Sequence, residues 1–317
     1  MPEAATVELD AQYRQLREES AMVDRSARGK ILVSGPDAAE YLQGQLTNDV
    51  EALAEGEGCY AALLDRKGHL QSDMRVLHLP DGLWLDIEPG PAPAVLSHLR
   101  TYSIGREVEI ADVTEEWAIL ALVGPRAAEL AGFEGLRPQY AQRIRRWQEI
   151  EVLGVATALG VDLIVRAGDA DRLRGLALAA GVVEVGEEAA EIVRIESGTP
   201  RFGADMSAET MPAEAGIVDA AVSFTKGCYI GQEPVARLHY KGRPNRQLRG
   251  LELSAPAEAG AELRLGDRTV GRIGSSCVSP ARGPIALAIV RREAEPGAEL
   301  AVGEAGVTAR VVDLPFG

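Results

Sequence analysis

The sequence predicts an α+β fold in which a duplicated α+β region precedes a small antiparallel β-barrel or sandwich. The duplication is indicated by two internal repeats of pattern, which pair residues 30–43 with 118–132 and residues 82–99 with 160–178. The β-domain is indicated by short alternating segments after Gly250, separated by Gly, Pro and Asp. Because 317 residues exceed what one hydrophobic core usually supports, at least two packed units are expected.

Each member of both repeats has the pattern of a strand followed by a helix. In the first pair, KILVSGPDAAEYLQ and AILALVGPRAAELAG, Pro36 and Pro125 suit the first helical position, because proline lacks the N–H that has no helical partner there. Chance similarity is the alternative, but we favour a true duplication. Residues 59–79 hold two apolar segments around the turn RKG, which predicts a β-hairpin with Gly68 at a positive φ.

The change to short alternating segments also predicts the domain boundaries. We place the boundary near Pro244, which gives an N-terminal region of residues 1–245 and a C-terminal β-domain of residues 246–317. The duplication divides the N-terminal region into two α+β subdomains of about 20–110 and 111–245.

The charge balance argues against a protein that binds nucleic acid non-specifically. With 33 Lys and Arg against 48 Asp and Glu, the formal net charge is -15, so a phosphate backbone would be repelled. Any anionic ligand must therefore be bound by a local group of cations.

Cysteine usage and the N-terminal segment predict a cytoplasmic protein. Cys59, Cys228 and Cys277 lie far apart without a CxxC pair, which fits a reducing compartment and neither a zinc ribbon nor a disulfide framework. The four histidines are equally scattered, so no metal site is expected. The N-terminus is acidic and helical in pattern, unlike a signal peptide, and no apolar run reaches the ~18 residues of a membrane span.

The segment KGCYIGQE, residues 226–233, contains the first candidate catalytic groups. Its thiol, Cys228, stands two positions from the ammonium of Lys226 and between two glycines that permit tight backbone paths. A thiol near a lysine or a helix N-terminus ionises more readily and becomes reactive. The alternative is that Cys228 is a buried small apolar residue, as most free cysteines are.

Basic residues follow this segment at every second position: Arg237, His239, Lys241 and Arg243. On a strand their side chains would share one face. Arg246 and Arg249 would extend the group. A solvated charged edge is the alternative, but so dense a cluster in an acidic chain favours an anion site.

A third candidate is RIESGTPRFGAD, residues 194–205. Its glycines and proline hold Glu196 and Asp205 near irregular backbone. A carboxylate fixed in this way can accept two parallel N–H bonds, the geometry that matches guanidinium-like and amidine-like groups. Acidic residues in a surface loop are the alternative.

Together these stretches resemble the YgfZ family, which is related to the T-protein (aminomethyltransferase) of the glycine cleavage system and binds folate. KGCYIGQE is similar to that family's signature, and RIESGTPRFGAD is similar to a segment that both relatives share. VGRIGSSCVSPARGPIALAIV, residues 270–290, resembles the C-terminal barrel segment of the superfamily, and QGQLTNDV, residues 43–50, adds support.

The resemblance implies a cloverleaf of three subdomains around a central channel for tetrahydrofolate or one of its derivatives. Two of them would be duplicated ferredoxin-like α/β subdomains and the third the antiparallel barrel. It also implies a role in assembling or maintaining iron–sulfur clusters, with folate and iron–sulfur client or assembly proteins as partners. Through certain cluster enzymes, tRNA modification would be supported indirectly, and no membrane partner is implied.

The resemblance assigns roles to individual residues. Glu196 stands where the superfamily holds the pterin, with Arg194 beside it, and Asp73 falls where T-proteins place acidic residues beside the reactive folate nitrogens. Arg237 and Lys241 would receive the glutamate tail of folate or an acidic partner surface. For Cys228, a persulfide, a transient bridge to a partner and a contact with cluster iron remain open. A stable cluster on this chain is not expected, because such clusters usually need four thiolates.

Whether the protein is an enzyme remains open at this point. T-proteins typically have two adjacent aspartates where this chain has Ser72 and Asp73, and the missing carboxylate argues against aminomethyl transfer. The leading hypothesis is a folate-dependent accessory factor for iron–sulfur proteins. The alternatives are a tetrahydrofolate-dependent aminomethyl or methyl transferase, and an RNA-binding protein that uses residues 237–249.

Overall fold

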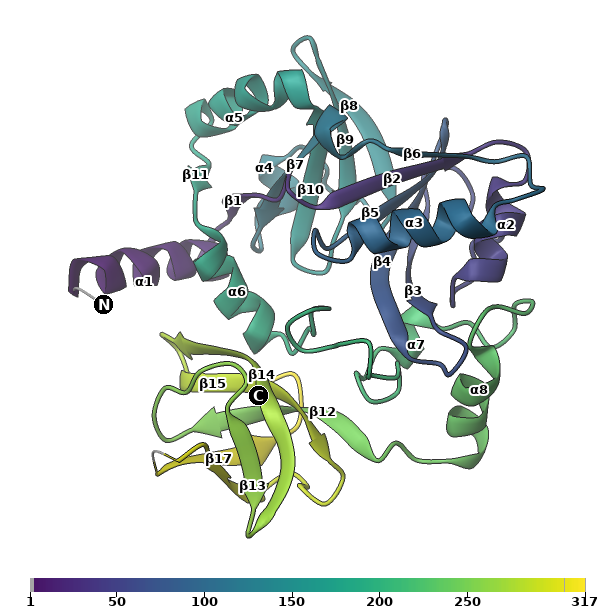
Figure 1. Cartoon of the computed structure of the whole chain (residues 1–317). Coiled ribbons are helices and arrows are strands. Elements are labelled where there is room, and N and C mark those ends of the chain that lie inside the picture. Colours follow the sequence, from purple (N-terminus) through teal and green to yellow (C-terminus); the bar gives the residue numbers. More distant parts are fainter. Residues whose placement is uncertain (1–2, 305, 317) are drawn as a thin grey trace. The chain divides into compact units, whose positions relative to one another are not determined.

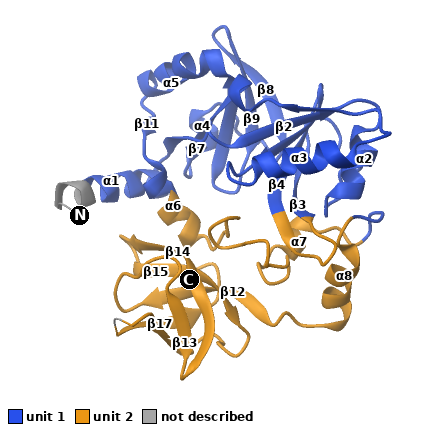
Figure 2. Ribbon diagram, in the orientation of Figure 1, with its two compact units in different colours: residues 1–63, 72–190, 225–229 blue, residues 64–71, 191–224, 230–317 orange. Residues whose placement is uncertain are grey.

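The computed structural model describes residues 3–304 and 306–316, which fold into two compact units (Figure 1, Figure 2). The first unit comprises residues 1–63, 72–190 and 225–229, and the second comprises residues 64–71, 191–224 and 230–317. Each unit is therefore assembled from segments that lie far apart in the sequence.

A five-stranded sheet with two covering helices forms one half of the first unit. The strand order is β3-β4-β5-β2-β6. The buried side chains of α2 and α3, such as Leu42 and Leu99, pack in one cluster with those of the strands, such as Val33 and Val76. The elements are β2 (Gly29–Ser34), α2 (Ala38–Gln45), β3 (Gly58–Leu64), β4 (Leu70–Leu79), β5 (Gly82–Ile87), α3 (Ala92–Tyr102) and β6 (Glu109–Asp112).

A six-stranded sheet forms the other half, in the order β11-β1-β7-β10-β9-β8. Its helices α4 and α5 contribute Ala127 and Leu173 to a cluster that also holds Leu120 and Leu163 of the strands. The elements are α1 (Glu3–Glu18), β1 (Ala21–Asp24), β7 (Trp117–Val123), α4 (Ala127–Leu130), β8 (Gln142–Trp147), β9 (Ile150–Ala156), β10 (Gly160–Arg166), α5 (Ala170–Ala179) and β11 (Val183–Glu184).

The inner faces of the two sheets pack against each other. Successive side chains of a strand point to opposite faces, so in β4 Val76 joins the cluster beneath the helices while Leu77 joins the cluster between the sheets. Trp84 and Trp117 meet edge to face in this inner layer, with ring centroids 5.2 Å apart. The first unit is therefore a layered structure with helices on its outer faces.

The predicted duplication is confirmed by strand pairing as well as by element order. In the first half β5 pairs antiparallel with β2, and in the second half β10 pairs antiparallel with β7, each strand being followed by its helix. The prediction for the prolines was wrong by two residues, because the first helical residues are Ala38 and Ala127. The N-caps are Asp37 and Arg126, so Pro36 and Pro125 lie in the turn before each helix.

The glycine of each Gly-Pro step explains why these turns are alike. Gly35 and Gly124 have φ angles of 106° and 129°, which side chains with a Cβ rarely adopt. A Cβ on Gly124 would also stand 2.6 Å from the carbonyl oxygen of Glu19, which is backbone and cannot swing away. The chain can leave the strand and enter the helix in this way only through glycine.

The predicted hairpin is formed by β3 and β4, and Gly68 in its turn has the expected positive φ of 82°. Residues 64–71 at its tip belong to the second unit. There Leu70 N–H donates to the carbonyl of Thr210 at 2.8 Å, and Pro234 packs beside Gly68. The tip is thus held by contacts within the second unit.

The C-terminal segment closes into an antiparallel barrel with the order β12-β15-β14-β13-β16-β17. The prediction of a β-domain is confirmed, and of the two forms considered the barrel is the correct one. Its interior is filled by aliphatic side chains such as Leu251, Ile273 and Val311. The strands are β12 (Arg246–Leu253), β13 (Glu262–Leu265), β14 (Arg268–Ser279), β15 (Gly283–Arg291), β16 (Glu299–Val302) and β17 (Val307–Val312).

Between β11 and the barrel the described residues form three α-helices: α6 (Glu187–Glu196), α7 (Val218–Ala221) and α8 (Gln232–Lys241). Among the residues that the structure describes, no helix is both long enough and apolar enough to cross a membrane.

The prediction that the basic residues after KGCYIGQE lie on a strand was wrong, because residues 232–241 form the helix α8. On a helix, residues four apart share a face, so Arg237 and Lys241 are neighbours while His239 points elsewhere. Gly231, at a φ of 82°, starts the helix, and Pro234 falls in its first turn, where proline is tolerated. Gly231 and Pro234 were therefore the two residues in the sequence that indicated the start of a helix.

Candidate functional site

The predicted site residues are divided between the two units. Asp73, Lys226 and Cys228 belong to the first unit, whereas Arg194, Glu196, Arg237 and Lys241 belong to the second. Each group is therefore described within its own unit.

Asp73, on β4, has a buried carboxyl group, and one of its two oxygens accepts a hydrogen bond. The hydroxyl of Tyr60, on β3, donates to its Oδ2 at 2.5 Å, and its Oδ1 is buried without a hydrogen-bond partner among the described residues. Burial raises the pKa of the Asp73 carboxyl, an effect that the Tyr60 hydrogen bond and the charge of Arg28 oppose in part. The group can accept a hydrogen bond from a ligand, and it holds a proton more readily than an exposed aspartate.

The neighbouring Ser72 does not supply a second acidic group. Its side chain is fully buried, and its Oγ donates to the backbone carbonyl of Asp73 at 3.0 Å. A single carboxyl, rather than a pair, therefore stands at this point of β4.

A buried network of ion pairs accompanies Asp73 in the first unit. Asp86, fully buried on β5, accepts from Arg28 Nε at 2.6 Å and from Arg75 Nε at 2.5 Å. Arg75 also contacts Asp162 on β10 at 2.6 Å, and Arg28 contacts Glu88. The network joins the two sheets through ion pairs that no sequence pattern indicates.

The thiol segment KGCYIGQE presents Cys228 to solvent and turns its neighbours inward. Cys228 is exposed, whereas Tyr229 is buried and the ammonium of Lys226 donates to backbone carbonyls, at 2.6 to 2.9 Å. Burial lowers the pKa of Lys226 to about 8. The charge of Lys226 acts on a different thiol, that of Cys59. Burial raises the pKa of Cys59 to about 12, and the positive charge of Lys226 opposes this rise in part. Activation of Cys228 by Lys226 stays a prediction.

Glu196, the last residue of α6, is buried against the end of β14. The hydroxyl of Ser279 donates to Oε1 of Glu196 at 2.5 Å. The same Ser279 Oγ accepts the N–H groups of Ala281 and Arg282 at 3.1 and 3.0 Å, which fixes its orientation. The carboxylate is thereby held in one place, as recognition of a paired N–H donor would require.

Arg194 has a different role from the predicted one. All five of its N–H groups are used within the second unit, so none remains for a cofactor. Glu191 accepts two of these bonds, Ser275 accepts one at 2.6 Å and Asp205 accepts one at 2.8 Å, while the fifth goes to the carbonyl of Thr199. Arg194 therefore fixes the position of α6, and through it the position of Glu196.

The remaining basic residues do not form the predicted continuous strip. Arg246 pairs with Glu214 at 2.9 Å, and Arg249 lies 3.5 Å from Asp313, so neither is turned to an external anion. Arg237 and Lys241, both exposed on one face of α8, remain the candidates for an anionic ligand.

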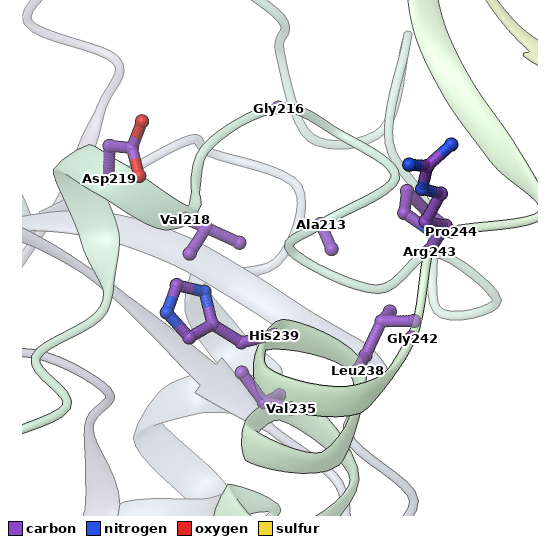
Figure 3. Close-up of a pocket in the computed structure, with 10 residues that line it drawn as sticks. All are labelled: Ala213, Gly216, Val218, Asp219, Val235, Leu238, His239, Gly242, Arg243 and Pro244. Carbon is purple, nitrogen blue, oxygen red and sulfur yellow. The ribbon is translucent and has the colours of Figure 1, made fainter.

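A pocket of about 290 Å³ lies on the other side of α8 (Figure 3). His239 and Arg243 line it, but Arg237 and Lys241 do not. The ring of His239 also stacks on that of Phe224, with centroids 3.9 Å apart. The lining residues are Ala213, Gly216, Val218, Asp219, Val235, Leu238, His239, Gly242, Arg243 and Pro244.

The sequence held a signal for one of the two partner residues, Tyr60, and none for the other, Ser279. A hairpin that turns at residues 66–68 brings Tyr60 beside residues 73 and 74, so the predicted hairpin already implied a partner for Asp73. Ser279 is different, because its meeting with Glu196 depends on how α6 packs against the barrel. No local pattern reports that contact.

Two consecutive parts of the chain match models of known families. The model described as the GCVT N-terminal domain matches residues 3–226, and the model described as the glycine cleavage T-protein C-terminal barrel domain matches residues 246–316.

Whole-chain comparisons agree. The chain is 31% identical to an aminomethyltransferase of Rubrobacter xylanophilus, over 97% of this chain and 86% of that protein. It is 30% identical to an aminomethyltransferase of Exiguobacterium sibiricum, over 96% and 88% of the two chains. The crystal structure of the glycine cleavage system aminomethyltransferase T from Bartonella henselae superimposes with a TM-score of 0.87 at 25% identity, over 98% and 89% of the two chains.

Proposed function

The chain belongs to the glycine cleavage T-protein family, and from this premise we propose that it binds tetrahydrofolate and acts as a cytosolic accessory factor for iron–sulfur proteins. The observation that carries this proposal is the thiol segment. Within the signature that resembles the YgfZ family, Cys228 is exposed while Lys226 and Tyr229 are held inside. The fold thus offers a single thiol to a partner.

Each unit, taken by itself, holds groups whose chemistry fits a part of a reduced folate. A pterin presents its exocyclic amine and a ring N–H side by side, and the fixed carboxylate of Glu196 is a suitable acceptor for this pair. In the first unit, the buried Oδ1 of Asp73, which has no partner among the described residues, suits an N–H donor of a ligand. Arg237 and Lys241 are proposed to receive the glutamate tail or an acidic partner surface. Bound folate would supply the capacity to carry a one-carbon unit.

Aminomethyl transfer is the second candidate function, because the curated relatives reported above bear that name. Asp73 favours it as well, since a carboxyl with a raised pKa can hold a proton for delivery to a reacting nitrogen. We prefer the accessory role for two reasons. Residues 72 and 73 supply one carboxyl group instead of two, and the thiol of Cys228 is exposed.

Calorimetric titration of tetrahydrofolate tests the ligand. The wild type is expected to bind saturably, and Glu196→Ala to bind about 10- to 100-fold more weakly, because a charge-assisted pair of hydrogen bonds is lost. Asp73→Asn is expected to weaken the binding of tetrahydrofolate. It is not expected to lower the free energy of unfolding, because burial already disfavours the ionised form of Asp73. Glu258→Ala, at an exposed position in the second unit, is the matched control. Absence of binding by the wild type would contradict the proposal.

A transfer assay separates the two functions. We expect no turnover of an aminomethyl donor to methylenetetrahydrofolate, and we expect Cys228→Ser to lower the activity of an iron–sulfur enzyme in complemented deletion cells. Robust turnover that survives Cys228→Ser and disappears in Asp73→Asn would instead establish the transferase.

A further inference from the structure

The carbonyl groups that bind Lys226 lie where a short helix ends. α2 ends at Gln45, and the last carbonyls of an α-helix have no partner within the helix. Its last turn holds no basic residue, and its C-cap, Leu46, is extended instead of being a left-handed glycine. The local sequence of α2 therefore lacks the usual means of satisfying these carbonyls.

Lys226 supplies the missing donor from 183 positions away. Its Nζ donates at 2.6 Å to the carbonyl of Gln43, which lies in that last turn. It also donates to two carbonyls just beyond the helix, those of Leu46 at 2.6 Å and Asn48 at 2.9 Å. A cation at this place faces the negative end of the helix dipole. The ring of Tyr229, 5.1 Å from the same Nζ, adds a cation–π contact.

The loop that receives Lys226 is itself firmly held. The side-chain amide oxygen of Gln43 accepts the N–H of Val50 at 2.8 Å, and the side chain of Asn48 donates to the carbonyl of Tyr60 at 2.8 Å. Thr47 Oγ1 accepts the N–H of Ala62 at 2.8 Å. A side chain bound to this loop is therefore bound to a fixed support.

We propose that Lys226 is a positioning residue that caps α2 and anchors residues 225–229, and with them Cys228, to the first unit. Residues 225–229 belong to the first unit although residues 224 and 230 belong to the second. Three hydrogen bonds of one ammonium, with the buried ring of Tyr229, provide that attachment. The inference deepens the proposed function and rests on it only for the role of Cys228.

Hydrogen exchange on the full-length protein tests the anchor without folate or a client protein. Lys226→Met keeps the aliphatic stem and removes the ammonium. We expect the amides of residues 46–50 and 227–229 to exchange at least about tenfold faster in this variant, since both partners of the anchor are released together. Lys67→Met, which removes an exposed ammonium in the turn between β3 and β4, is expected to leave both segments unchanged.

Chemical rescue distinguishes an anchor from a general packing contact. In Lys226→Ala, propylammonium is expected to restore slow exchange in both segments, whereas propanol, which has the same length and no charge, is not. Unchanged exchange in Lys226→Met, uniform acceleration across the first unit, or equal effects of propylammonium and propanol would each overturn the proposal. If Lys226→Met does not fold, Lys226→Gln, which keeps two donors, is expected to show a smaller acceleration confined to the same two segments.

Discussion

Asp86→Asn is expected to lower the free energy of unfolding of the first unit by about 3–5 kcal/mol, the usual result of breaking a buried ion pair from one side. The Asp86 carboxylate is fully buried and accepts from the guanidinium groups of Arg28 and Arg75, at 2.6 and 2.5 Å. The substitution removes the negative charge between two largely buried cations. Asp162 continues to pair with Arg75 and Glu88 with Arg28, but both guanidinium groups lose the fully buried carboxylate that they share.

Urea unfolding followed by tryptophan fluorescence measures this loss in the correct unit. All three tryptophans, Trp84, Trp117 and Trp147, belong to the first unit. The matched control is Glu40→Gln, which removes an ion pair with Arg106 at 2.7 Å that is exposed to solvent. It is expected to change stability by less than about 1 kcal/mol. A loss for Asp86→Asn no larger than that of the control would contradict the role of the network.

The same network predicts a dependence of stability on pH. Burial alone would raise the pKa of Asp86, but Arg28 and Arg75 outweigh it and lower the pKa below the ordinary value of 3.8. Because the folded state then binds the proton less readily than the unfolded state, the contribution is complete above that value and is lost as pH falls through the folded pKa. The difference in free energy of unfolding between the wild type and Asp86→Asn should therefore decrease only at acidic pH.

Much of the fold could be predicted because its signals are local. The Gly-Pro steps, the hairpin turn at residues 66–68 and the alternating segments after Gly250 each fix the backbone within a few residues. Barrel closure is different, since it depends on the pairing of β12 with β17, more than fifty residues later. No short pattern distinguishes that pairing from the facing sheets of a sandwich.

The candidate site was predictable in its residues more than in their roles. Arg194 and Glu196 stand two positions apart in one motif, yet the first is used up in five internal hydrogen bonds while the second presents a carboxylate. Alternating charge after residue 236 suggested a strand, although Pro234 and Gly231 mark a helix start. The ion network could not be predicted, because Asp86 and Asp162 each resemble an ordinary polar position in an alternating strand.

Arg194→Met is expected to destabilise the second unit by about 3–5 kcal/mol and to weaken folate binding although Arg194 has no donor left for a ligand. The side chain joins α6 to Ser275 on β14, and Glu196 reaches Ser279 on the same strand. Asp205, whose carboxylate is buried, would lose its guanidinium partner. Because the tryptophans lie in the other unit, the loss should be measured by hydrogen exchange in the barrel strands.

Arg194→Lys separates positioning from direct contact with a ligand. A lysine keeps the positive charge but offers three donors, so at least two of the five acceptors lose their bond. If Arg194 acts by fixing α6, Arg194→Lys should resemble Arg194→Met in its loss of folate affinity, with intermediate stability. If Arg194 instead met an anionic group of the ligand, the lysine would preserve most of the affinity, and positioning would be the wrong explanation. Ser275→Ala removes a single acceptor. Comparison with this variant shows whether losing the contact between α6 and β14 is enough to lower the affinity for folate.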